Sequence, residues 1–145
     1  MKKFNFTLQR VLEYNIHMQK KEKDNLSEMQ YEYKNLCNKM EHLLDKYNNY
    51  KKRQHDESIE GITVTDLIIL NTYISGLQTQ ILLLKKEMIT MELKIEQQIQ
   101  TLLAVTKEKT TLEKLRNKHL NEYNIMERKH EELFIDEFVA NKASN

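Results

Sequence analysis

The chain has 145 residues, no proline and only two glycines; 31% of its residues are charged, and its net charge is +1. Proline and glycine interrupt regular structure, so their near absence excludes a loop-rich compact domain and favours long helices or a coiled coil. Positive and negative charges are interleaved along the chain, which argues against a nucleic-acid surface, because such a surface requires clustered Lys and Arg residues.

The first predicted helix covers residues 4–57. Its apolar and tyrosine side chains recur at steps of three and four, which is typical of a coiled-coil seam. Between Met18 and Met29 the spacing shifts phase by one, which predicts a local stutter in the supercoil. The seam residues of this arm are Phe4, Leu8, Val11 and Met18, followed by Met29, Tyr33, Leu36, Met40, Leu43, Tyr47 and Tyr50.

Residues 58–65 predict a turn. Gly61 can adopt a left-handed backbone conformation at low steric cost, as residues just beyond a helix end often do. The sequence Thr63-Val64-Thr65-Asp66 has the pattern of a helix start, because a threonine hydroxyl can cap the free amides and an acidic residue suits the helix dipole. The two arms are therefore expected to form an antiparallel hairpin.

The second predicted helix covers residues 66–139, with a frayed tail at 140–145. From Leu67 to Leu133, alternating steps of three and four meet mostly apolar or tyrosine side chains. A repeat of 3.5 residues held over this length predicts a coiled-coil seam with left-handed supercoiling. The exceptions are Gln98, Lys109, Arg116, His119 and His130.

The predicted arms differ in length, at roughly 80 Å and 110 Å for a rise of about 1.5 Å per residue. Folding the chain at residue 61 places Phe4 near residue 118, so residues after about 120 are expected to lack an intrachain partner. An apolar stripe without a partner suggests a binding surface. The candidate residues, including two N-terminal phenylalanines, are Phe4, Phe6, Leu120, Tyr123, Met126, Leu133, Phe134 and Phe138.

No pattern in the sequence indicates catalysis or a cofactor. There is no glycine-rich phosphate loop and no nucleophile motif, and none of the five histidines is paired at the spacing of a helical zinc site. We therefore expect no enzymatic activity, no metal or cofactor, and no nucleic-acid or small-molecule ligand.

Cellular location is indicated by cysteine usage and hydropathy. The single cysteine, Cys37, excludes an intrachain disulfide and favours a reducing compartment. The N-terminus has no apolar run long enough for a signal peptide, and polar residues interrupt the apolar cluster at 66–84, which we expect not to span a membrane. These features predict a soluble cytoplasmic protein.

Three stretches resemble the flagellar FliJ family. The opening FNFTLQRVLEYN is similar to its N-terminal signature, TVTDLIILNTYISGLQTQI to its middle segment, and TKEKTTLEKLRNKHLNEYNIMERKHEELFIDEF to its C-terminal half. The resemblance covers nearly the whole chain. It differs at Asn15, where many relatives carry a basic residue.

The resemblance implies a component of flagellar type III export, located at the cytoplasmic face of the inner membrane at the flagellar base. FliJ-like proteins form an antiparallel coiled coil similar to the central stalk of rotary ATPases. The implied partners are the hexameric export ATPase, the membrane export gate and the export chaperones. In the family, an aromatic and an apolar residue four apart contact the gate, and Tyr73 and Leu77 match these positions.

Three alternatives stay open at this point. The hairpin could be a stalk or tether in another secretion or cytoskeletal assembly, or it could bind nucleic acid, which the interleaved charges oppose. The third alternative is a parallel dimer of continuous helices without a turn.

Overall fold

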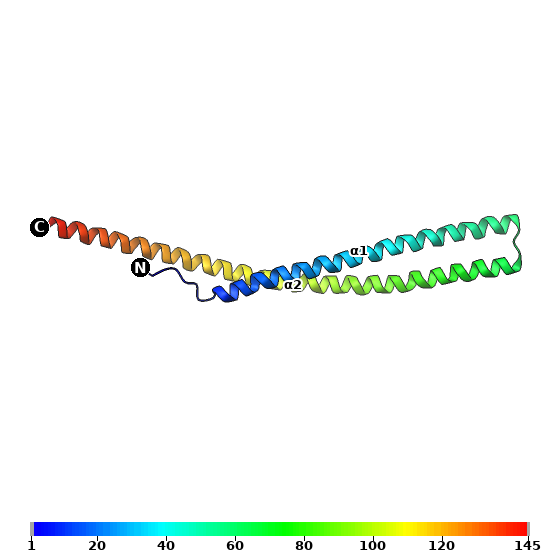
Figure 1. Cartoon of the computed structure of the whole chain (residues 1–145), viewed down its shortest axis with the longest axis horizontal. Helices are drawn as coiled ribbons and strands as arrows, with labels where there is room; N and C mark the ends of the chain where they lie inside the picture. The colour runs from blue at the N-terminus through cyan, green and yellow to red at the C-terminus, as the bar shows by residue number, and fades with distance from the viewer. Residues whose placement is uncertain (1, 145) are drawn as a thin grey trace. The chain divides into compact units, whose positions relative to one another are not determined.

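The chain folds into two long helices in a computed structural model that describes residues 2–144. Helix α1 is Gln9–Glu60 (52 residues) and helix α2 is Val64–Ala143 (80 residues) (Figure 1). The helices pack against each other on either side of a turn at residues 61–63, and residues 2–144 contain no strand. The predicted all-α hairpin with a longer second helix is confirmed, which excludes a continuous helix without a turn.

The turn is built by one glycine and one threonine. Gly61 has a φ of 102°, a left-handed conformation that favours glycine, and its N–H donates a 2.9 Å hydrogen bond to the carbonyl of Glu57. The hydroxyl of Thr63 accepts a 3.2 Å hydrogen bond from the N–H of Asp66, which caps the start of α2. The helix-start signal in the sequence therefore has the predicted structural role.

The N-terminal boundary lies later than expected, because α1 begins at Gln9 rather than near residue 4. The N–H of Gln9 donates a 3.0 Å hydrogen bond to the carbonyl of Phe6, so a turn precedes the helix. Residues 2–6 have no regular secondary structure, and the side chain of Phe6 is buried. Helix α2 continues to Ala143, beyond the expected end at residue 139.

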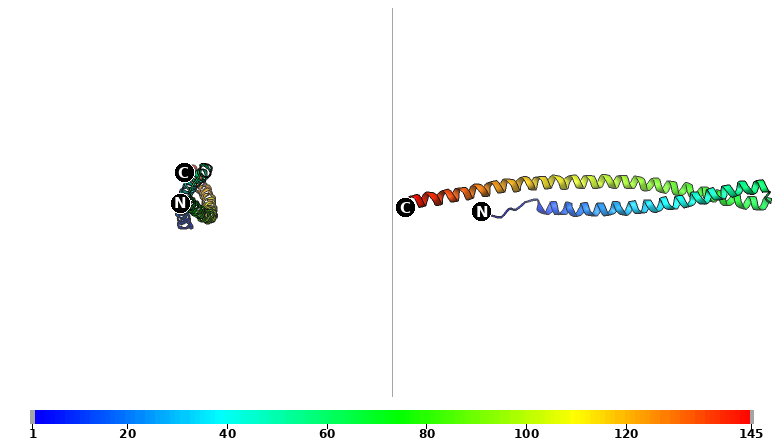
Figure 2. Two further views of the ribbon diagram at one scale, coloured as in Figure 1. Left: turned by 90° about the vertical axis from the view of Figure 1, so that its right-hand side faces the viewer. Right: turned by 90° about the horizontal axis from the view of Figure 1, so that it is seen from above.

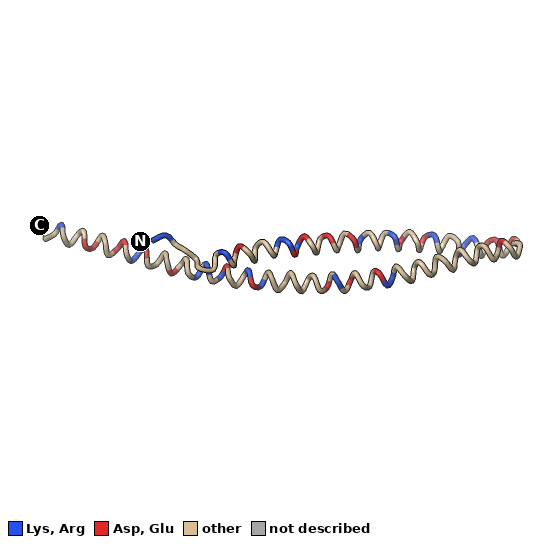
Figure 3. Tube along the Cα trace, turned by 60° about the horizontal axis from the view of Figure 1, so that its bottom comes forward, with Lys and Arg blue, Asp and Glu red and all other residues tan. Residues whose placement is uncertain are grey.

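The chain divides into two compact units, which we describe separately. The turn unit is Lys23–Gln100, and the terminal unit contains residues 2–22 and 101–144. Basic and acidic residues are interspersed along both helices in Figure 3, as the sequence predicts.

In the turn unit, the two helices lie side by side along a shared apolar seam (Figure 2). Leu36, Met40 and Leu84 form its buried centre. Burying one such side chain stabilises the fold by about 1.5–3 kcal/mol, so the seam supplies much of the stability of this unit. The partly buried residues packed against this centre are Leu43, Ile81, Met88 and Met91.

The seam of α2 keeps the predicted phase. Every predicted seam position from Leu67 to Tyr123 is buried or half-buried, whereas Met126, His130 and Leu133 are exposed. The 3.5-residue repeat therefore locates the inner face of α2 correctly. The exposure of the seam positions from Met126 onward shows that the pairing of α2 ends after Tyr123.

The seam of α1 keeps one phase as well, so the predicted stutter is wrong. Leu8 and Val11 are exposed, whereas Leu12 and Asn15 are buried. From Leu12 the inner positions continue in steps of three and four through Gln19, Glu22 and Leu26 to join the confirmed stretch from Met29 to Tyr50. Asn15, Gln19 and Glu22 are three successive polar residues on the inner face of α1. A search for apolar residues alone therefore leads to the wrong face of this helix.

In the terminal unit, Gln19 is one of these polar residues, and it is hydrogen-bonded to α2. The amide of Gln19 donates to the hydroxyl of Thr106 at 3.1 Å, and its carbonyl oxygen accepts a 2.9 Å hydrogen bond from Lys109. Arg116 donates a 3.2 Å hydrogen bond to Gln9. Polar pairs at inner positions fix the register of a coiled coil at a cost in stability.

Candidate functional site

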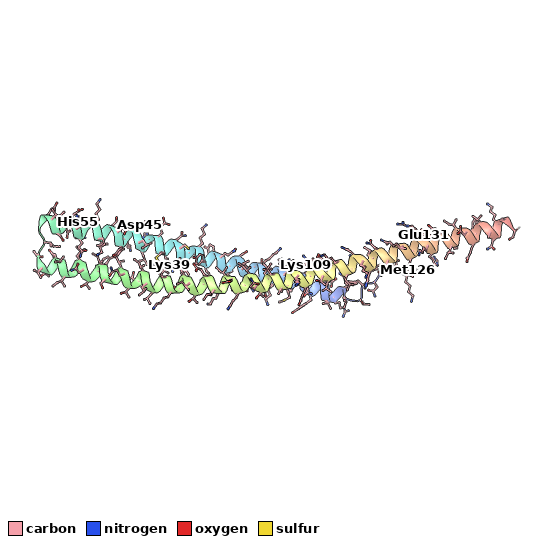
Figure 4. All side chains as sticks on the ribbon, turned by 180° about the vertical axis from the view of Figure 1, so that it is seen from behind. Lys39, Asp45, His55, Lys109, Met126 and Glu131 are labelled. Carbon is pink, nitrogen blue, oxygen red and sulfur yellow. The ribbon has the colours of Figure 1, made fainter. Side chains whose placement is uncertain are left out.

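The clearest candidate site is the end of α2, residues 124–143, which we call the C-terminal segment. Except for Glu127, its side chains are all exposed. Met126 and Glu131 project from a part of the helix with no other helix beside it (Figure 4). Its exposed large apolar residues are Ile125, Met126, Leu133, Phe134, Ile135, Phe138 and Val139.

The apolar residues of the C-terminal segment do not form one stripe. Leu133, Phe134 and Ile135 are consecutive, and all three are more than half exposed, at 62%, 66% and 57%. Successive residues of an α-helix are about 100° apart, so these three side chains point in three directions around the axis. The segment therefore suits a partner that surrounds the helix better than a flat one.

Four of the eight residues predicted to form the binding surface lie instead in or beside an N-terminal aromatic cluster. Phe6 is only 4% exposed and packs edge-on against His119, with ring centroids 5.7 Å apart. Phe4 packs against Tyr123 at 5.7 Å and lies beneath the guanidinium of Arg116 at 5.6 Å. The pairing of the terminal unit thus extends to Tyr123, and the expectation that residues from 120 onward lack a partner is wrong by about one turn of helix.

Leu120 is half-buried, as are Phe4 and Tyr123. The hydroxyl of Tyr123 donates a 2.6 Å hydrogen bond to the carbonyl of Lys2. Of the eight residues predicted to form the binding surface, only Met126, Leu133, Phe134 and Phe138 are exposed enough to bind a partner without a rearrangement of the N-terminal segment.

The two residues predicted to contact the export gate differ in exposure: Tyr73 lies on the surface and Leu77 in the core. Tyr73 is 43% exposed, and its ring lies 4.3 Å from that of Tyr50, whereas Leu77 is 4% exposed and belongs to the seam. A hydrogen bond with Tyr50 raises the pKa of Tyr73. A partner can therefore reach Tyr73 on the closed hairpin but cannot reach Leu77.

The sequence analysis missed an exposed apolar face around Tyr73. Ile68, Ile69 and Leu83 of α2 are each about 60% exposed, although α1 covers the opposite face of this helix. The signal was present in the sequence, because consecutive apolar residues such as Leu67-Ile68-Ile69-Leu70 cannot all point to one seam.

Helix α2 contains a stretch long and apolar enough, by length and composition alone, to cross a membrane. The expectation that interrupting polar residues exclude such a stretch is wrong on this criterion. In the hairpin, 22% of that stretch is buried. Core helices of soluble proteins pass the same test.

The family model described as flagellar FliJ protein matches residues 4–145. No curated protein and no solved structure matches the chain.

Proposed function

Because the chain belongs to the flagellar FliJ family and is thus a component of flagellar export, we propose that it acts there as a non-enzymatic stalk. In this proposal the C-terminal segment enters the ring of the hexameric export ATPase. The stalk also contacts the export gate and hands over export chaperones at the cytoplasmic face of the membrane.

The observation that carries this proposal is the exposure of Leu133, Phe134 and Ile135 around the circumference of one helix. A ring encloses a helix and can bury all three side chains at once, each for about 1.5–3 kcal/mol. A flat partner could bury about half of the circumference. A segment with exposed apolar residues on all sides therefore supports a ring-shaped partner.

The gate contact is proposed for the exposed face that includes Tyr73 and Ile69. Leu77 supports this face from beneath, because it is packed in the seam. The family motif of an aromatic and an apolar residue four apart then combines one contact residue with one residue that positions it.

The test is co-purification of the full chain with the export ATPase. Phe134→Asp combined with Phe138→Asp should abolish binding, because both charges would have to be desolvated inside the ring. The matched control is Leu103→Asp, an exposed apolar residue (56% exposed) in the paired part of α2. Binding of the double variant at wild-type strength, with helix content unchanged, would refute the proposed ring contact.

A further inference from the structure

One side of the turn unit carries a continuous groove between the two helices. Three adjoining hollows of about 610, 580 and 630 Å³ share lining residues. The first two share Gln80, and the second and third share Ile69 and Tyr73. On α2 the groove extends from Asp66 to Glu87, about 32 Å of helix at a rise of about 1.5 Å per residue.

The α2 wall of this groove is mainly apolar between its ends, where Asp66 and Glu87 lie, and Gln80 is an amide within it. Ile69 and Leu83 are 63% and 60% exposed, and Gly76 has nothing within 4 Å of where its Cβ would lie. The hydroxyl of Thr72, which also lines the groove, donates a 2.8 Å hydrogen bond to the carbonyl of Ile68 within the same helix. Between Ile68 and Gly76, this wall therefore presents mainly apolar groups.

The α1 wall is cationic. Lys39, Lys46 and Arg53 line it at intervals of seven residues, and His42 lies between the first two. Lys39 is labelled in Figure 4. Arg53 is already bonded to Glu57 at 2.8 Å, whereas neither Lys39 nor Lys46 has an ion pair within the described chain. A fitting occupant is an amphipathic helix with apolar residues toward α2 and carboxylates toward the two lysines.

The C-terminal segment offers both apolar rings and carboxylates, although its apolar residues are not confined to one face. Residues 130–139, HEELFIDEFV, contain four carboxylates and no Lys or Arg. Phe134 and Phe138 are four residues apart, so they share one face of the helix, and each is more than 60% exposed. Residues 130–139 span about 15 Å as a helix, enough to cover the part of the groove between Lys39 and Lys46. The rest of the segment adds Arg128, Lys129 and Lys142.

We propose that this groove binds the C-terminal segment of a second copy of the chain. Phe134 and Phe138, about 6 Å apart along their helix, then pack against Gly76 and Leu83. Glu131 and Glu137, which flank this face, lie near Lys39 and Lys46. Because groove and segment are different surfaces, the contact is heterologous and leaves one free groove and one free segment in every dimer. Such a contact propagates head to tail into a ring or an open chain.

The experiment is analytical ultracentrifugation of the full chain over a range of concentrations. The wild type should form dimers and larger species as concentration rises. Leu83→Asp, a groove variant, and Phe134→Asp/Phe138→Asp, a segment variant, should each weaken self-association at least about tenfold. Both sites are exposed, so the helix content of each variant, measured by circular dichroism, should equal that of the wild type.

Mixing the two variants gives the decisive result. The segment variant keeps an intact groove and the groove variant an intact segment, so together they should form a one-to-one dimer and nothing larger. Lys39→Glu/Lys46→Glu should also weaken association. A wild-type chain that stays monomeric, or a mixture that forms no dimer, would overturn the proposal.

This inference does not rest on the proposed function, and the two can fail separately. Because the groove includes Ile69 and Tyr73, a copy whose groove is filled cannot contact the gate through the same face. Leu133 lies about 100° from Phe134 around the helix, away from the face assigned to the groove. Leu133→Asp should therefore impair ATPase binding while self-association persists. Equal loss of self-association in Leu133→Asp and in the segment variant would contradict the assigned face.

Discussion

The ring of Phe4 packs against the ring of Tyr123 with their centroids 5.7 Å apart, although the residues lie near opposite ends of the chain. The hydroxyl of Tyr123 also bonds to the carbonyl of Lys2 at 2.6 Å. Helix α1 begins only at Gln9. Through this contact, the preceding residues 2–6 continue the packing against α2 beyond the N-terminal end of α1. It thereby sets the start of the exposed C-terminal segment.

Phe6 should be the residue that holds this N-terminal segment in place. Phe6→Ala removes a ring that is 4% exposed and leaves a cavity against His119, so the local loss should be about 3 kcal/mol. Hydrogen exchange should then rise in residues 2–12 while the turn unit stays protected. Phe138→Ala, which truncates an exposed ring, is the control and should leave exchange in residues 2–12 unchanged. Unaltered protection in Phe6→Ala would show that the cluster contributes nothing.

The two glycines should respond to alanine in opposite directions. Gly76 lies within α2 with open space at its Cβ position, so Gly76→Ala should stabilise the chain by about 1 kcal/mol through helix propensity. Gly61 has a φ of 102°, so Gly61→Ala should destabilise it by about 1–2 kcal/mol. Urea unfolding of both variants measures the two shifts. Changes of the same sign would contradict the structural roles assigned to the two positions.

The raised pKa of Tyr33 predicts a loss of stability at high pH. Its hydroxyl donates a 2.5 Å hydrogen bond to Glu92, and this bond, with desolvation and charge repulsion, raises the pKa of Tyr33 to about 12. Because the folded pKa lies above the ordinary value of 10, this contribution is complete below pH 10 and is lost as pH rises through about 12. Thermal unfolding at several pH values should show this loss in the wild type.

The matched variants for this pH effect are Tyr33→Phe and Tyr31→Phe. Tyr33→Phe should flatten the alkaline part of the stability profile, since it removes the titrating hydroxyl. Tyr31 is 67% exposed, so its replacement should leave the profile as it is in the wild type. Identical profiles for Tyr33→Phe and the wild type would exclude Tyr33 as the origin.

We expect Leu77 to act as a core residue and Tyr73 to act as a contact residue. Leu77→Ala should lower stability by about 2–5 kcal/mol, because its side chain is 4% exposed in the seam. Tyr73→Ala should lower stability by no more than about 0.5–1.5 kcal/mol, the worth of its contact with Tyr50, but should weaken gate binding directly. Unfolding curves and a gate-binding assay measure the two effects.

The control for this pair is Leu36→Ala, which removes a comparably buried leucine from α1. If Leu77 acts through the fold, Leu36→Ala and Leu77→Ala should weaken gate binding in proportion to their losses of stability. Unimpaired gate binding by Tyr73→Ala would count against the proposed contact face.

The hairpin could be predicted from sequence because its signals are local and repetitive. The seam of α2 from Leu67 to Tyr123 follows from the 3.5-residue repeat, and the turn follows from Gly61 and the cap at Thr63. Both depend on residues close in sequence or on a pattern repeated many times, so single exceptions such as Lys109 do not hide them.

Two other features depend on contacts that a repeat does not encode. Asn15 and Gln19 occupy inner positions of α1 although they are polar, which hid the true phase. The segment around Phe6 is specified by a pairing with His119, far away in the sequence. Its opening residues also fit a helical spacing by coincidence, so the first helix was predicted to begin too early.

The most direct test of the stalk account is photo-crosslinking from three consecutive positions of the C-terminal segment. A photoreactive amino acid replaces Leu133, Phe134 or Ile135, one at a time, and each variant is irradiated together with the export ATPase. If a ring encloses the helix, all three positions should crosslink to the ATPase with similar yield. Crosslinks from only one of the three positions, or from none, would contradict it.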